Sequence, residues 1–203
     1  YTIKASSIGV PDTFFTATAT YGAAVAMIPS AGLNQTKPIL SPLDVPFTVR
    51  IVDIGDNAVP LKNIQFAITN KPSGDTSASL STTLATSDDS GKAVTQLTLG
   101  SKVGFYTVKA MITTLEATES QEIIITDKNG RKGKKPTREP VTFAALEATF
   151  TAEATYGAAA VLASVTGSDQ INPTSTTLDT AFAVTVKDIG GNFVPKVPVK
   201  FAI

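Results

Sequence analysis

FTVRIVDIGDNAVPLKNIQFAI, at Phe47–Ile68, is matched without a gap by FAVTVKDIGGNFVPKVPVKFAI at Phe182–Ile203. In both copies, apolar residues alternate with polar ones on either side of a D-I-G-x-N loop. A period of two is typical of strands with one buried face. Glycine, asparagine and aspartate between two such runs favour a turn. The sequence therefore predicts the same pair of strands twice, 135 positions apart.

The repetition extends outward from these stretches. FTATATYGAA at Phe15–Ala24 matches FTAEATYGAA at Phe150–Ala159 with the same offset of 135. YTIKA at Tyr1–Ala5 matches YTVKA at Tyr106–Ala110, but with an offset of 105. The change of offset indicates an insertion of 30 residues between about 111 and 150. Self-similarity at a fixed period is typical of repeat proteins.

The offsets predict the layout of the chain. We expect residues 1–14 to hold the closing strand of a preceding repeat and residues 15–126 to form a complete domain. Residues 127–142 are then a basic linker or hairpin tip, and residues 143–203 are the first half of a following repeat. We therefore expect the chain to be a window on a longer array that starts and stops inside repeats.

The fold class predicted from these patterns is all-β, with antiparallel β-sandwiches in tandem. Further strands are expected at Ala93–Leu99 and Tyr106–Ile112, and short strands separated by turn residues are typical of a sandwich. The alanine-rich run Gly22–Met27 suits one helical turn or an edge strand equally well. The expected core includes Phe47, Val49, Phe66, Leu97, Tyr106 and Val108.

Composition excludes several classes of function. The chain has 203 residues and no histidine, cysteine or tryptophan, so it cannot build a Ser-His-Asp triad, a thiolate metal site or a disulfide. Its net charge of zero argues against nucleic-acid binding, which usually needs a strongly basic surface. Its apolar runs are far shorter than the roughly 20 residues of a transmembrane helix. We expect no enzymatic activity, no cofactor, no nucleic-acid partner and no transmembrane segment.

The order of three motifs resembles the bacterial immunoglobulin-like domain of group 1, found in invasin- and intimin-type surface proteins. The motifs are D-x-G-x-N-x-V-P within Val52–Ile68 and Lys187–Ile203, T-x-D-x-x-G within Thr86–Leu99, and G-x-Y-T-V-x-A at Gly104–Ala110. The resemblance covers most of the chain outside residues 116–146. It implies secreted immunoglobulin-like sandwiches joined end to end on a bacterial cell surface. Leu61 and Lys196 depart from the family, which often has glycine there.

The two D-I-G-x-N loops have two interpretations. A calcium ion needs about 6–8 oxygen ligands, and the second copy loses one carboxylate because Gly191 replaces Asp56. The favoured alternative is a hairpin turn in which Gly55 and Asn57 supply positive φ. We therefore expect no metal site in either loop.

Two further groups of acids are candidate sites. Asp88 and Asp89 form a catalytic pair or, as favoured here, cap a turn in which Gly91 is left-handed. Glutamates at 116, 119 and 122 share a face if helical, but their threonine-rich surroundings favour a strand or linker with solvated acids. No catalytic residue is expected in either group.

One segment breaks the balanced charge. Residues 128–138 carry six of the 17 basic residues. The segment is either a solvated tip or linker, or a docking element for an acidic neighbouring module or an anionic cell surface. The candidate interaction patch consists of Lys128, Arg131, Lys132, Lys134, Lys135 and Arg138.

We expect a structural or adhesive module of a bacterial surface adhesin, stalk or extracellular fibre. Its expected partners are neighbouring immunoglobulin-like repeats or identical subunits, with any cell-surface receptor bound by regions outside this chain. One alternative is a subunit of a self-assembling filament or surface layer in which neighbouring chains donate strands. Another is a carbohydrate-binding accessory domain of a secreted enzyme, which the lack of tryptophan disfavours.

Overall fold

The computed structural model describes residues 1–112 and 145–203, and within them the chain is all-β. The prediction of the fold class is confirmed at this level, since these residues form several antiparallel sheets and no helix. The alanine-rich run enters strand β3 (Ala26–Ala31) and forms no helical turn. None of the described residues forms a helix that could span a membrane.

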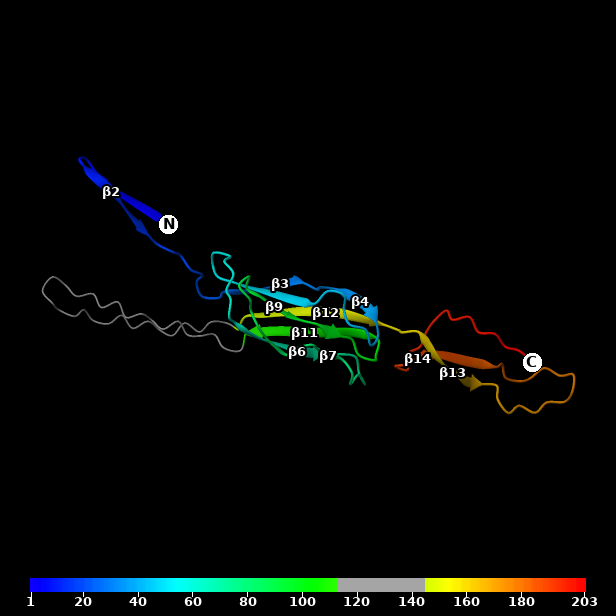
Figure 1. The fold of residues 1–203 in the computed structure, drawn as a ribbon. Helices are drawn as coiled ribbons and strands as arrows, with labels where there is room; N and C mark the ends of the chain where they lie inside the picture. The colour runs from blue at the N-terminus through cyan, green and yellow to red at the C-terminus, as the bar shows by residue number, and fades with distance from the viewer. Residues whose placement is uncertain (113–144) are drawn as a thin grey trace, which may run out of the picture.

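Two sheets enclose the main core of the molecule. Residues 21–112 and 145–155, which form these sheets and the loops between them, are here called the central unit (Figure 1). The smaller sheet has the order β3-β5-β9, and the larger has the order β4-β12-β11-β6-β8. The short strands β7 and β10 pair antiparallel with each other as a separate two-stranded sheet. The bounds are β4 (Gln35–Pro38), β5 (Phe47–Val52), β6 (Asn63–Asn70), β7 (Ser79–Leu80), β8 (Leu84–Thr86), β9 (Lys92–Thr95), β10 (Leu97–Thr98), β11 (Gly104–Ile112) and β12 (Glu147–Thr155).

The core between the sheets confirms the predicted members. They are fully buried or nearly so: Phe47, Val49, Phe66, Leu97, Tyr106 and Val108. Alternate residues of β5 and β11 point inward, as the period of two requires. The rings of Phe47 on β5 and Phe150 on β12 stack with centroids 4.7 Å apart and an interplanar angle of 21°. This contact links the two sheets.

Strand β12 belongs to the sheet of the central unit, although the repeat pattern groups its sequence with the following repeat. It pairs antiparallel with β11 from Met111–Glu147 to Gly104–Ala154, and parallel with β4 on its other side. Phe150 is 0% exposed and the alanines at 148, 152 and 154 are also buried. The central core therefore depends on residues that lie beyond position 144.

Two expected strands differ from the structure. Ala93–Leu99 is split into β9 and β10, because the main chain at Gln96 turns to bond with Ser81. Val199–Ile203, the counterpart of part of β6, is not a strand. In the central unit β6 is paired on both sides, by β8 and β11, whereas the corresponding neighbours are not among the described residues of the second copy. Without hydrogen bonds to neighbouring strands, the alternation of apolar and polar residues alone does not form a strand here.

Strands β1 (Thr2–Ser7) and β2 (Val10–Thr16) form an antiparallel hairpin that lies at one end of the molecule (Figure 1). Ile3 lies opposite Phe15 in this N-terminal hairpin, just as Val108 lies opposite Phe150 in the β11–β12 pair. The hairpin therefore reproduces the register of β11 and β12. Its apolar side chains are exposed, including Ile3 and Phe15.

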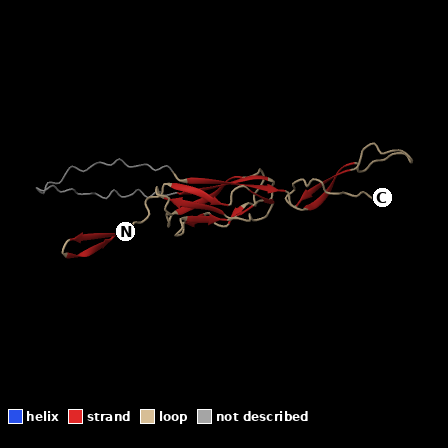
Figure 2. Ribbon diagram, turned by 90° about the horizontal axis from the view of Figure 1, so that it is seen from above, coloured by secondary structure: helices blue, strands red, loops and turns tan. Residues whose placement is uncertain are grey.

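Residues 156–203, here called the C-terminal segment, lie at the opposite end of the central unit (Figure 2). Strand β13 (Ala159–Thr166) pairs antiparallel with β14 (Ala183–Asp188), and these two strands are the counterparts of β3 and β5. Unlike β3 and β5, they have no second sheet packed over them among the described residues.

The two non-glycine residues noted as departures from the family both adopt left-handed backbone. Leu61 has φ 59° and Lys196 has φ 58°. Most residues adopt this conformation at some cost, and glycine adopts it freely. The residue after the proline is therefore left-handed in both copies, although neither is a glycine.

Candidate functional site

The D-I-G-D-N loop of the central unit is organised by one aspartate. The carboxylate of Asp53 accepts hydrogen bonds from the main-chain N–H groups of Gly55 at 2.8 Å and Asn57 at 2.9 Å. It also accepts from the Asn57 side-chain amide and, at 2.7 Å, from the N–H of Gly22. The carboxylate therefore fixes the turn and ties it to the start of the repeat.

The turn interpretation needs one correction. The residue with positive φ is Asp56, at 59°, and its counterpart Gly191 at 79°; neither Gly55 nor Asn57 is left-handed. The physical reason is that Asp53 draws the N–H groups of Gly55 and Asn57 toward itself, which leaves the intervening residue to reverse the chain. Arg50 stabilises Asp56 there through a 2.9 Å ion pair.

The second copy repeats this network and adds contacts to the central unit. Asp188 accepts from Gly157, Gly190 and Asn192, as Asp53 does from their counterparts. In addition, the Asn192 amide donates to the main-chain oxygen of Ser101 at 2.9 Å. Lys102 donates through its Nζ to the oxygen of Gly190 at 2.6 Å. We call these contacts of Asn192 and Gly190 with Ser101 and Lys102 the junction.

The central side of the junction is held in place by two buried polar groups. Asp75, which is 4% exposed, accepts hydrogen bonds from the N–H of Ser101 at 2.9 Å and from the Ser77 hydroxyl at 3.0 Å. The Tyr106 hydroxyl donates to the main-chain oxygen of Lys102 at 2.9 Å. The loop that contacts Asn192 is therefore braced from the interior of the central unit.

The geometry leaves little space across the junction. A Cβ atom added to Gly190 would overlap the main-chain oxygen of Ser101 and lie 3.0 Å from Ile39. A Cβ atom at Gly157 would lie 3.2 Å from Ile39, which is 5% exposed. The two glycines thus permit close approach of two successive repeats.

Three buried aspartates have lowered pKa values. The N–H of Gly22, followed by the Asn57 side chain and main chain, lowers the pKa of Asp53 to about 2 from an ordinary 3.8. For Asp75 and Asp188, burial alone would raise the pKa, but the combined hydrogen bonds outweigh it and the pKa is lowered. Stabilisation from such groups is complete above the unfolded pKa and is lost as pH falls through the folded value.

We therefore expect the stability of the chain to decline between pH 3.8 and about 2. Asp53→Asn should be less stable at neutral pH, because the new amide presents N–H where the network supplies donors. It should also show a weaker decline over the acid range. Urea unfolding at a series of pH values measures both effects, with Asp89→Asn in an exposed turn as the matched control. An unchanged acid profile in Asp53→Asn would contradict this assignment.

The other predicted carboxylate pair also lies in a turn. Asp88 accepts hydrogen bonds from the N–H groups of Ser90 at 2.8 Å and Lys92 at 2.9 Å. Gly91 is left-handed, with φ 72°, as the sequence predicts. Asp88 therefore acts as a turn cap, and the catalytic interpretation of Asp88 and Asp89 gains no support from its contacts.

Several predicted sites cannot be placed. The glutamates at 116, 119 and 122 lie outside the described residues, as does the basic patch of Lys128, Arg131, Lys132, Lys134, Lys135 and Arg138. The expected linker at 127–142 lies there too. Within residues 1–112 and 145–203, no three acidic, histidine or cysteine side chains are grouped so that they could hold a metal ion.

Sequence reasoning missed the junction, and only the loop on its C-terminal side had a signal in the sequence. The Tyr-Gly pair at 21–22 recurs at 156–157, and the aspartate at 53 recurs at 188, so the N–H donor and its acceptor repeat together. Ser101 contributes its main-chain oxygen and Lys102 contributes a flexible side chain. No sequence motif predicts either contact. Comparison with protein-family models, curated proteins and solved structures finds no match for this chain.

Proposed function

We propose that the chain is part of a tandem array of immunoglobulin-like sandwiches that serves as a structural or adhesive module on a bacterial cell surface. The observation that carries this proposal is the junction, because the loop on its C-terminal side is a repeated element. Asp188, Gly157 and Asn192 occupy the positions that Asp53, Gly22 and Asn57 occupy one repeat earlier. The loop that makes the junction is therefore present in both copies of the repeat.

The strand order supports the immunoglobulin-like assignment. In constant-type sandwiches strands A, B, E and D share one sheet, and C, F and G share the other. Here β3, β5 and β9 share one sheet, as A, B and E do, and β6, β11 and β12 share the other, as C, F and G do. Strands β4 and β8 flank this second sheet. The bond from the Tyr106 hydroxyl to the main chain four residues upstream resembles the tyrosine corner of these folds.

On this proposal β12 is the last strand of the central unit, which spans the 135 residues from Tyr21 to Thr155, and the next unit begins at Tyr156. The N-terminal hairpin is then the last two strands of the preceding unit. Because β12 continues directly into the Tyr-Gly pair, no separate linker joins the central unit to the C-terminal segment. A short connection and a hydrogen-bonded junction suit a stalk that transmits force and sets reach.

The proposal predicts a fixed orientation across the junction. Cysteines introduced at Ser73 and Ser164 can carry spin labels without competing thiols, since the chain has no cysteine. Pulsed electron resonance should give one narrow distance distribution. Gly190→Ala should broaden it, because the new methyl group overlaps the Ser101 oxygen.

Gly55→Ala is the matched control for this experiment. Its Cβ would meet Asn57 at 2.9 Å, much as a Cβ at Gly190 would meet Asn192 at 2.8 Å, but its three nearest neighbours all lie within its own loop. The distance distribution should therefore stay narrow in Gly55→Ala. A broad distribution in the unsubstituted chain, or equal broadening by both alanines, would overturn the proposed rigid array.

A further inference from the structure

A strand near the start of the central unit lies beside the strand by which the chain leaves it. The chain enters the unit through β3 and β4 and leaves it through β12. Strands β4 and β12 pair in parallel, with Gln35 opposite Ala152 and Pro38 opposite Thr155. All other strand pairs in the described part of the chain are antiparallel. A pull on the two ends of the unit therefore reaches the β4–β12 ladder at its opposite ends.

The direction of a pull decides how this ladder is loaded. When two parallel strands are pulled from opposite ends, their evenly spaced hydrogen bonds share the load. When the same strands are pulled from one end, the bonds break one after another. Further bonds close the ladder at both ends: the Thr151 hydroxyl donates to the Asn34 side-chain oxygen at 3.1 Å, and the Ile39 N–H donates to the Thr155 oxygen at 2.9 Å. These bonds therefore resist a pull along the strands together.

Strand β3 offers less resistance on the same path. It is an edge strand that pairs, among the described strands, only with β5, and its register shifts between Pro29 and Ala31. Pro29 has no N–H group to donate to that ladder. We therefore expect β3 to detach from β5 first, which passes the load to the turn that leads into β4.

The side chain of Gln35 fastens β4 to the rest of the unit at that turn. Its amide donates to the main-chain oxygens of Gly32 at 2.8 Å and Val45 at 2.7 Å, and its oxygen accepts from the Val45 N–H at 2.9 Å. Val45 lies in the loop that leads into β5, so these bonds connect the start of β4 with the opposite sheet. Gln170 makes the same three bonds one repeat later. Both copies therefore hold this turn in the same way.

The far end of β4 is fastened as well. The Leu40 N–H donates to the oxygen of Gly100 at 3.0 Å, and the Leu43 N–H donates to the oxygen of Leu97 at 3.0 Å. Because both ends of β4 are bonded to the rest of the unit, a pull on β12 cannot carry β4 along with it. The two strands separate only when the ladder between them breaks.

We infer that the parallel ladder between β4 and β12 carries the load when the array is pulled, and that Gln35 holds β4 in place under this load. The inference rests on the proposed array, because only there does force enter the unit at Tyr21 and leave it at Thr155. It adds to that proposal the strands that bear the force and one side chain that positions them.

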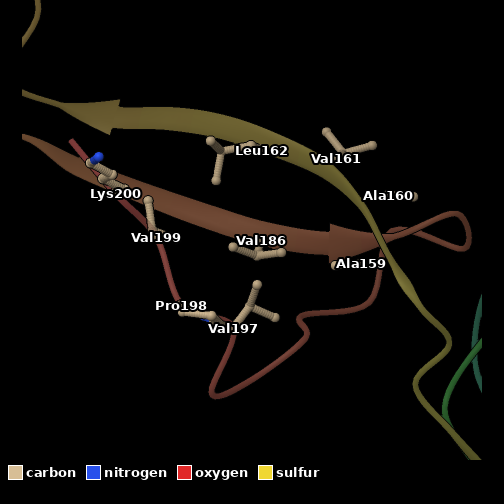
Figure 3. Close-up of a pocket in the computed structure, with 9 residues that line it drawn as sticks. All are labelled: Ala159, Ala160, Val161, Leu162, Val186, Val197, Pro198, Val199 and Lys200. Carbon is tan, nitrogen blue, oxygen red and sulfur yellow. The ribbon is translucent and has the colours of Figure 1, made fainter. Parts of the chain in front are cut away.

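The test is single-molecule force spectroscopy of the full chain, with handles on introduced cysteines. Cysteines at the exposed positions Thr18 and Ala158 lie outside the two ends of the unit, and the chain has no other thiol. Ala158 lies ahead of β13, so the load bypasses the C-terminal segment. That segment would add weaker transitions, because Figure 3 shows a hollow lined by Leu162 on β13, Val186 on β14 and Val197, where the central unit has a filled core.

A second pair of handles, at Leu40 and Ala158, loads the same ladder from one end. Leu40 is 46% exposed and follows Pro38, which lies opposite Thr155. At equal loading rate, the rupture force should be severalfold higher with the first pair of handles than with the second. Rupture under load reports the rate of forced unfolding, so this difference reflects the direction of the pull and not the equilibrium stability, which is the same in both.

Gln35→Ala separates the role of this side chain from a general loss of stability. The variant should fold, because the bonds between Gln35 and Val45 are exposed to water. It should lower the rupture force with the first pair of handles and leave it unchanged with the second, which breaks the ladder from the Pro38 end. Thr36→Ala, at an exposed neighbouring position of β4, is the matched control and should change neither force.

Two results would overturn the inference. One is an equal rupture force with the two pairs of handles. The other is a Gln35→Ala variant that lowers neither force, or lowers both by the same factor. Either result would leave the spin-label experiment standing, because that experiment measures the orientation of successive repeats and this one measures the resistance of a single unit.

Discussion

Replacing Phe150 by alanine is expected to lower the free energy of unfolding of the central unit by about 3–5 kcal/mol. The side chain is 0% exposed and its ring stacks on Phe47 of the opposite sheet. Truncation removes both the buried apolar surface and the contact between the sheets, and it leaves a cavity that rigid strands cannot fill. Since whole domains are stable by only about 5–15 kcal/mol, the loss is a large part of the total.

Phe15→Ala is the matched control, because Phe15 occupies the same place in its repeat but is 59% exposed. It should change the stability of the central unit by less than about 0.5 kcal/mol. Urea unfolding of both variants, followed by tyrosine fluorescence at low protein concentration, measures the difference. If the two alanines had similar effects, β12 would not complete the central core.

Replacing Asp75 by alanine is expected to cost about 2–3 kcal/mol, since it removes one acceptor from several buried or half-buried donors. The N–H groups of Ser77, Ala78 and Ser101 all point to this carboxylate. An unsatisfied buried donor loses its bond to water without gaining another partner. The substitution should also loosen the Ser101 loop and so broaden the distance across the junction.

Two further substitutions separate the causes of this effect. Asp89→Ala, in an exposed turn, should change stability by less than about 0.5 kcal/mol. Asp75→Asn keeps one acceptor oxygen, but its amide N–H groups face one of the remaining N–H donors. Its loss of stability should therefore lie between those of Asp75→Ala and Asp89→Ala. Urea unfolding measures all three. An Asp75→Ala variant as stable as Asp89→Ala would contradict the bracing role of this carboxylate.

The sequence predicted the elements of the core better than it predicted their partners. Alternation in Phe47–Val52 and Tyr106–Ile112 identified the inward faces, because a strand shows its two faces in its own sequence. The pairing of strands cannot be predicted in this way. The offset of 135 shows that Phe150 and Phe15 are equivalent positions, but it does not show which sheet either residue joins. The pairing of β12 with β11 is set by packing against Phe47, which only the folded unit reveals.

The turns show a similar division. The sequence predicts that Gly91 is left-handed, because the glycine of a D-x-x-G turn takes that conformation, and the structure confirms it. In the D-I-G-x-N loops the left-handed residue is Asp56, whose conformation follows from the bonds that Asp53 makes to its neighbours. Contacts to main-chain oxygen, such as Asn192 to Ser101, have no sequence pattern, so the junction was visible only in the structure.

Amide hydrogen exchange across the full chain tests the central claim most directly, namely that β12 completes the unit that precedes it. Amides of Ala148, Phe150, Ala152 and Ala154 should exchange as slowly as those of β11 and β6, at the rate of global unfolding of the central unit. Amides of β13 and of the N-terminal hairpin should exchange much faster at low protein concentration. If β12 exchanged as fast as β13 while β11 stayed protected, β12 would belong with the C-terminal segment and the account would be wrong.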